Sequence, residues 1–355
     1  MKKLFVVFVV IAIVSAVLFA CSIAAYGVKD GNYGVSIGIA PFDIDSSTGF
    51  GLGFSSGVIF RDGASKISYE LKSREDYDYT FHEPVEEVEL SGLSGEMVVS
   101  CGDTDNVKVK YRTGNGVGKS FYAGVENGRL TVKETGTFIF NLFNFGASET
   151  KIEVILPEEI YKSVNINSTS GKVTVDKVIS DSFKSNITSG KGEFNIFAED
   201  IDVYTTSGTV NIENCTKEKA ERIAVKSLSG SRSISGFEAG EFIFDSTSGE
   251  LTAEGISGKV SVDSTSGNVR LSFAEWNGDL DIDMTSGNTE VILPEGSGID
   301  IDLDCTSGSV KSDLDGQKVV LGKGVLGEES RLTTGGENVH RVRVNITSGN
   351  VNIHN

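Results

Sequence analysis

The segments Phe242–Gly249 (FIFDSTSG), Val260–Gly267 (VSVDSTSG) and Leu280–Gly287 (LDIDMTSG) are three copies of one pattern. Thr-Ser-Gly, or a close variant of it, recurs throughout the second half of the chain, ending at Gly171, Gly190, Gly208, Gly230, Gly249, Gly267, Gly287, Gly308 and Gly349. Successive spacings from the first to the eighth glycine are 19, 18, 22, 19, 18, 20 and 21 residues. A fixed period of this length is the signature of a repeat architecture.

Alignment of the copies on the glycine reveals strands on both sides of it. The residue seven positions before the glycine is apolar in all nine copies, and the residue five before it in eight, whereas the position between is mostly polar. Such alternation is typical of a strand with one buried face, and it resumes after the glycine, as in Val210 and Ile212. One strand-turn-strand unit cannot bury its apolar edge alone, so the units must stack. We therefore predict an all-β fold, a right-handed single-stranded parallel β-helix (β-solenoid).

The nine glycines are predicted to be structural corners. Glycine supplies the positive φ that a sharp turn often needs. Ser and Thr hydroxyls beside it can bond to local backbone groups or to the next rung. The recurrence of this motif in nearly every unit favours architecture over an active site.

The chain divides into three predicted parts. Residues 1–25 form an export segment, residues 26–83 a Gly-rich juxtamembrane stalk, and residues 84–355 the solenoid, which begins with an irregular copy, Val88–Gly95. The Phe-rich stretch 138–145 is expected to cover a face of the solenoid. The interval of 41 residues between Gly308 and Gly349 equals two periods, and Thr334-Gly335-Gly336 is the candidate degenerate copy within it.

The N-terminus predicts export. Lys2 and Lys3 precede an uncharged apolar run from Leu4 to about Ala25, which as a helix is long enough to cross a bilayer. A retained signal anchor, a lipoprotein signal with Cys21 as the lipidated residue, and a cleaved secretory peptide all fit this run. All three interpretations place the rest of the chain outside the cytoplasm. The signal anchor would hold it at the cell membrane by a single transmembrane pass, and the lipoprotein signal would hold it there by a lipid anchor.

Composition excludes several function classes. The net charge is −18, which disfavours nucleic-acid binding. Cys21, Cys101, Cys215 and Cys305 are widely scattered, and three histidines are too few for a His-based metal site. None of the three histidines lies in a Thr-Ser-Gly motif, so we predict no catalytic residues, no cofactor and no enzyme activity. The acidic stripes are the candidate calcium ligands, since adjacent rungs would bring their carboxylates together: Asp279, Asp281, Asp283, Asp300, Asp302 and Asp304. The alternative to calcium binding is that these aspartates form a solvated outer face, whose charge limits aggregation between sheets.

Trp276, the single tryptophan, lies in a predicted loop between rungs. It would either stack on a sugar or, more commonly, cover a rung edge.

These features together resemble the bacterial putative-adhesin family of LiaG-like cell-envelope proteins. The leader, the repeated corner and two Val-Ile-Leu-Pro segments, 154–157 and 291–294, carry the resemblance over residues 84–355. It implies an envelope-exposed β-solenoid with no family active site. We expect a non-catalytic cell-envelope protein whose solenoid serves adhesion, scaffolding or the binding of a cell-wall polymer or an envelope protein. The alternatives are an accessory of an envelope-stress signalling system and a polysaccharide-active β-helix enzyme. Self-association through open solenoid ends is a further expectation.

Overall fold

The structure is a computed structural model that describes residues 66–71, 75–113, 119–136, 150–314, 317–321, 328–333 and 338–355. All of them belong to the compact unit Ser56–Asn355. The predicted export segment, Cys21, the Phe-rich stretch and Thr334-Gly335-Gly336 lie outside the described residues. Within the described ranges no helix is long and apolar enough to span a membrane.

The described residues form strands, turns and irregular segments. In chain order the strands are β1 (Lys66–Leu71), β2 (Glu75–Phe81), β3 (Glu87–Gly92), β4 (Glu96–Gly102), β5 (Val107–Thr113), β6 (Lys119–Glu126), β7 (Arg129–Gly136), β8 (Thr150–Pro157), β9 (Ile160–Ser168), β10 (Lys172–Asn214), β11 (Ala220–Ser227), β12 (Ser231–Ser235), β13 (Glu238–Ser246), β14 (Glu250–Ser264), β15 (Asn268–Phe273), β16 (Leu280–Ile292), β17 (Ser297–Leu314), β18 (Gln317–Leu321), β19 (Glu328–Thr333) and β20 (Asn338–His354). The prediction of an all-β fold is confirmed.

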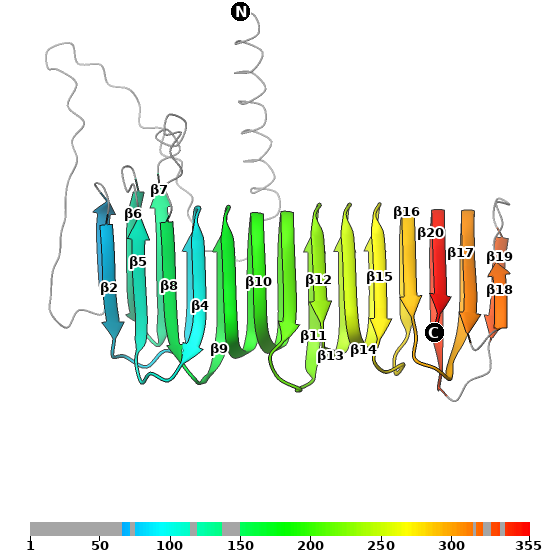
Figure 1. The fold of residues 1–355 in the computed structure, drawn as a ribbon, viewed down its shortest axis with the longest axis horizontal. Coiled ribbons are helices and arrows are strands. Elements are labelled where there is room, and N and C mark those ends of the chain that lie inside the picture. The colour runs from blue at the N-terminus through cyan, green and yellow to red at the C-terminus, as the bar shows by residue number, and fades with distance from the viewer. Residues whose placement is uncertain are drawn as a thin grey trace, which may run out of the picture. The chain divides into compact units, whose positions relative to one another are not determined.

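Each repeat has two arms, one before and one after its glycine. The leading arms pair in parallel, as β13 does with β14 through Phe242 and Val260. The trailing arms pair in parallel as well, as β14 does with β15 through Leu251 and Val269. The inward side chains of both arms form one continuous apolar core. We call the outward surface of the leading arms the first face and that of the trailing arms the second face. Successive arms lie side by side in Figure 1.

The corner glycines form a ladder in which no side chain fits. Gly249 has a φ of +116°, and a Cβ placed on it would lie 2.1 Å from the carbonyl oxygen of Gly230 in the preceding rung. The same relationship links Gly230 to Gly208 and Gly267 to Gly249. Glycine is therefore required at each corner for two reasons. The backbone has a positive φ there, and the backbone of the preceding rung leaves no space for a Cβ.

The stacking order departs from the sequence order. The C-terminal strand β20 lies between β16 and β17 and pairs in parallel with both (Figure 1). At the other end, β3 lies between β7 and β9, and β4 lies between β8 and β10. The Gly95 corner, which joins β3 to β4, is therefore flanked by strands that come later in the chain. The sequence period alone would have stacked each repeat on its predecessor.

Both ends of the stack are antiparallel, so the prediction of a purely parallel coil over residues 84–355 is wrong there. Strands β5 and β6 pair antiparallel with β8 and β7, and β18 and β19 pair antiparallel with β17. Strands β1 and β2, from the predicted stalk, pair with β6 and β5. Short antiparallel strands limit the open edges that a parallel coil would leave. The handedness of the coil stays a prediction.

Candidate functional site

The corner hydroxyls are engaged in holding the corners together. Ser248 donates to the carbonyl of Leu228 in the preceding rung at 3.2 Å, and Ser266 donates to that of Thr247 at 3.3 Å. Ser246, two residues before Ser248, donates within its own corner to the carbonyl of Ser248 at 3.1 Å. The hydroxyls of the Thr-Ser-Gly motif are thus used in hydrogen bonds that hold the corners together. A functional site is therefore expected on the first or the second face and not at the corners.

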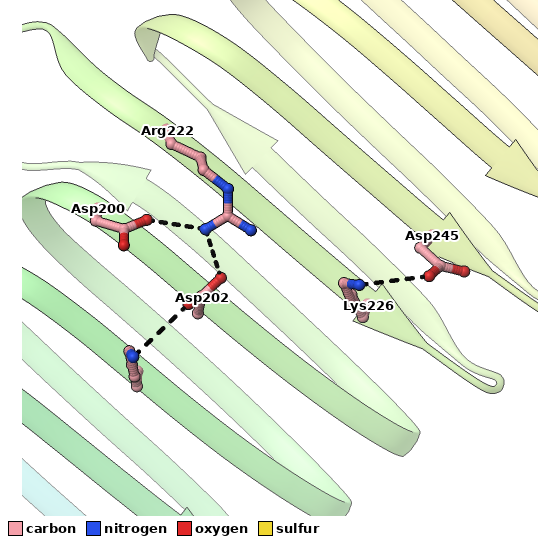
Figure 2. Close-up of polar contacts among 6 residues, drawn as sticks. Asp200, Asp202, Arg222, Lys226 and Asp245 are labelled. Atoms are coloured by element: carbon pink, nitrogen blue, oxygen red, sulfur yellow. Dashed lines mark hydrogen bonds and ion pairs between the residues drawn. The ribbon is translucent and has the colours of Figure 1, made fainter. Parts of the chain in front are cut away.

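The first face carries columns of alternating charge. Asp200, Arg222, Glu241 and Lys259 follow one another in register across β10, β11, β13 and β14. Figure 2 shows Arg222 Nη1 between two carboxylates, 3.0 Å from Asp200 Oδ1 and 2.9 Å from Asp202 Oδ1. Lys259 Nζ lies 2.8 Å from Glu241 Oε1, and this hydrogen bond raises the pKa of the lysine. Cross-strand pairs of opposite charge stabilise a sheet, which gives this column a structural role.

The two acidic stripes are not neighbours. Strand β20 lies between them, and Arg343 pairs in register with Asp281 on one side and Asp302 on the other. Arg341 Nη2 lies 2.8 Å from Asp302 Oδ2, and Asn345 donates to Asp283 at 3.2 Å. The predicted proximity of the stripes, on which the calcium assignment rested, is therefore wrong. Among the described residues no group of three or more His, Cys, Asp or Glu side chains is arranged to hold a metal.

The second face carries a row of amides. Asn268, Asn288 and Asn350 are exposed and lie one residue after their corner glycines on β15, β16 and β20. Asn350 Nδ2 donates to Asn288 Oδ1 at 3.1 Å, and Asn288 Nδ2 to Asn268 Oδ1 at 3.4 Å. Ser309 of β17 extends the row by donating to Asn350 Oδ1 at 2.9 Å.

This row borders a shallow groove of about 390 Å³, here called the amide groove, lined by Glu250, Leu251, Asn268, Val269, Arg270, Asn288, Thr289, Glu290 and Asn352. His354 Nε2 lies 3.1 Å from Glu290 Oε1, and this hydrogen bond lowers the pKa of Glu290, together with nearby Arg270 and against the effect of burial. The groove therefore offers fixed amides and a fixed carboxylate. This groove was not predicted from the sequence, although the recurrence of Asn directly after three corner glycines was its signal.

A second groove, of about 410 Å³, lies on the first face near the N-terminal end and is lined by Glu87, Glu89, Tyr122, Glu126, Asn127, Arg129 and Thr131. Arg129 Nε donates to Glu87 Oε2 at 2.7 Å across β7 and β3. An ion pair thus crosses this groove, which lacks the row of equivalent amides found on the second face.

Trp276 covers the edge of a rung. It is 4% exposed, and its Nε1 donates to the carbonyl of Gly298 at 2.8 Å. Its ring packs edge-to-face on Phe273 at 5.0 Å and on His340 at 5.7 Å. The alternative of a sugar-stacking ring is not supported, because the indole is buried.

The cysteines that the structure describes show no sign of activation. Cys101 and Cys215 are free, half-buried thiols. Burial raises the pKa of Cys101 to about 11, and it also raises the pKa of Cys215. A raised pKa keeps a thiol protonated and unreactive at neutral pH.

The stacked arms and their decorated faces define an all-β repeat protein. The chain belongs to the family described as Toastrack DUF4097, which matches residues 85–354. The family resemblance predicted from the repeats is confirmed.

Two solved structures are similar to parts of the chain. One is described as a putative cell adhesion protein from Clostridium sporogenes, with 12% identity over 79% of this chain and 99% of that one and a TM-score of 0.25. The other is described as a putative adhesin from Bacteroides fragilis, with 10% identity over 80% and 98% and a TM-score of 0.36. TM-scores this low do not establish a shared fold. A search of curated proteins gave no match.

Proposed function

We propose that this chain is a non-catalytic binding protein of the cell envelope, and that its amide groove holds an extended, hydroxyl-rich polymer such as a glycan chain. The observation that carries the proposal is the row of Asn268, Asn288 and Asn350, exposed in three adjacent strands and joined by hydrogen bonds. Adjacent strands lie about 4.8 Å apart, so a polymer crossing them meets the same amide repeatedly.

The chemistry of the groove supports an uncharged ligand. A side-chain amide both donates and accepts, which suits hydroxyl groups. The net charge of −18 repels polyanions. The shallow form of the groove suits a chain lying across the rungs, and such faces are how repeat proteins bind extended partners.

The surface role rests on the predicted export segment and on the resemblance of the repeats to the putative-adhesin family. The membrane attachment, the extracytoplasmic location and the polymer remain parts of the proposal. Because Glu290 and Arg270 in the groove contact each other, these charged groups are occupied in a structural pair, which favours binding over acid–base catalysis.

Co-sedimentation of the full-length protein with insoluble cell-wall polysaccharide tests the proposal. We expect saturable binding, and we expect Asn268→Ala with Asn288→Ala to weaken it about tenfold or more, the equivalent of about 1.4 kcal/mol. The matched control is Asn167→Ala with Asn186→Ala, because these residues form the same kind of amide pair at 2.9 Å on the first face.

Equal loss of binding in both double variants would contradict the assignment of the groove. Release of soluble sugar from the polysaccharide, abolished in the groove variant, would instead favour the polysaccharide-active enzyme.

A further inference from the structure

Arg232 occupies a core position that its neighbours fill with apolar side chains. It lies on β12, two residues after the corner Gly230, and it is 4% exposed. The parallel register places it between Val210 of the preceding rung and Leu251 of the next. A charged group taken from water into such a core is costly unless it is paired.

The hydrogen bonds of Arg232 do not neutralise its charge. Its Nη1 donates to the hydroxyl of Ser227, and its Nη2 donates to that of Ser246 at 3.2 Å. Both hydroxyl protons are already directed to corner carbonyls, those of Ser229 and Ser248, each at 3.1 Å. The two serines therefore act toward the guanidinium as neutral acceptors. In the described part of the chain no Asp or Glu forms an ion pair with Arg232.

A further donor lies one rung away. Thr205 pairs in register with Ser227, is 0% exposed, and its hydroxyl has no hydrogen-bond partner among the described residues. A guanidinium has five N–H donors, and two of those in Arg232 are used. Thr205 thus offers a free hydroxyl, which can donate or accept, in the rung that precedes Ser227, the residue to which the Arg232 guanidinium donates.

We propose that the core between the Gly208 and Gly249 corners contains a binding site for a small monovalent anion of the halide class, held by the Arg232 guanidinium and the Thr205 hydroxyl. A halide provides the negative charge that the hydroxyls of Ser227 and Ser246 lack, and it accepts hydrogen bonds from several directions. A water molecule would accept hydrogen bonds but would leave the charge uncompensated. The site is independent of the amide groove, which lies on the outward surface of the trailing arms.

Thermal unfolding of the full-length protein tests the site. Sodium chloride is compared with sodium gluconate at equal ionic strength, so that screening is the same, while gluconate is too large for a buried site of halide size. We expect the Tm to rise with chloride by roughly 3–5 °C at about a hundred times its Kd, and to stay constant in gluconate. Thr205→Val, which keeps the shape of the side chain, should reduce this rise. Arg222→Gln, on the first face, should leave it unchanged.

Crystals soaked in bromide give the deciding measurement on the unaltered chain, so the test does not depend on whether a variant of Arg232 folds. An anomalous peak within hydrogen-bond distance of the Arg232 guanidinium supports the site. A water molecule at that place, or equal Tm values in chloride and gluconate, overturns it.

Discussion

The guanidinium of Arg341 lies 2.8 Å from the carboxylate of Asp302, although 39 residues separate them in the sequence. This contact joins β20 to β17, and on its other side the backbone N–H of Arg341 donates to Asp279 of the acidic stripe at 3.0 Å. If β17 were stacked directly on β16, the two stripes would face each other. Like charges directly opposite destabilise a sheet, whereas the basic residues of β20 between them stabilise it.

Reversal of these charges should weaken the insertion of β20. For Arg341→Glu with Arg343→Glu we expect the free energy of unfolding to fall by about 1–2 kcal/mol, because exposed pairs are weak but each new carboxylate faces others on both sides. Urea unfolding at low and high salt measures the change, which should shrink as salt screens it. Arg112→Glu is the control, since it disrupts an exposed pair with Asp76 at 3.0 Å outside these strands. A loss that does not respond to salt would contradict the electrostatic explanation.

The corner ladder predicts a large difference between two glycines that both have a positive φ. Gly249→Ala should cost at least about 3 kcal/mol, because the new Cβ would approach the carbonyl oxygen of Gly230 to 2.1 Å. Gly236→Ala should cost only about 1 kcal/mol, since Gly236 has a φ of +72° but nothing lies within 4 Å of its Cβ position. Chemical denaturation of both variants checks the prediction. Similar losses would mean that φ alone, and not the close approach, selects glycine.

Trp276 should stabilise the fold through packing more than through its hydrogen bond. Trp276→Phe keeps an aromatic ring on Phe273 and should cost about 1 kcal/mol, much of it from the lost bond to Gly298. Trp276→Ala should cost about 3–5 kcal/mol through the cavity it leaves. Thermal unfolding monitored by circular dichroism compares the two. If both variants retained full stability and lost polysaccharide binding, the ring would have a role in binding after all.

Asp263 should destabilise the fold at neutral pH. Its pKa is raised from 3.8 by partial burial and by Asp245 and Asp283 in the neighbouring strands. A carboxyl whose folded pKa is raised costs stability above that pKa, and the cost disappears as the pH falls below the unfolded value. Asp263→Asn should therefore stabilise the protein at pH 7 by no more than a few tenths of a kcal/mol, because solvent screens an exposed carboxylate, and should have no effect near pH 3. Asp105→Asn, at an exposed loop position, is the control. A gain that persists at pH 3 would rule out this cause.

The repeat in the sequence was enough to predict the strands, the corners and the inward columns. Positions such as Val260 and Val262, seven and five before their glycine, are 0% and 2% exposed as the alternation requires. This succeeds because side-chain direction in a strand depends only on position within the strand. The first copy, ending at Gly95, was also predicted, and it joins the same ladder of glycines as the later copies.

The candidate binding groove was not predicted, for a physical reason. Asn288 and Asn350 are adjacent only because β20 is inserted beside β16, and no local pattern reveals which strand lies beside which. The same limit produced the error over the proximity of the two acidic stripes. Asp281 and Asp302 belong to consecutive repeats, so the sequence suggested contact, while the structure separates them by Arg343.

The sequence by itself determined which residues face inward, where each rung bends and that the rungs must stack, because these depend on local periodicity and on the conformational freedom of glycine. Only the tertiary structure decided the order of the rungs, the antiparallel ends and the neighbours of each charged or amide side chain. Rungs with the same apolar columns fit beside one another whatever their place in the chain, so local periodicity does not reveal that β20 is inserted between β16 and β17. Contacts between chain-distant side chains, such as Arg341 with Asp302, form only in that order.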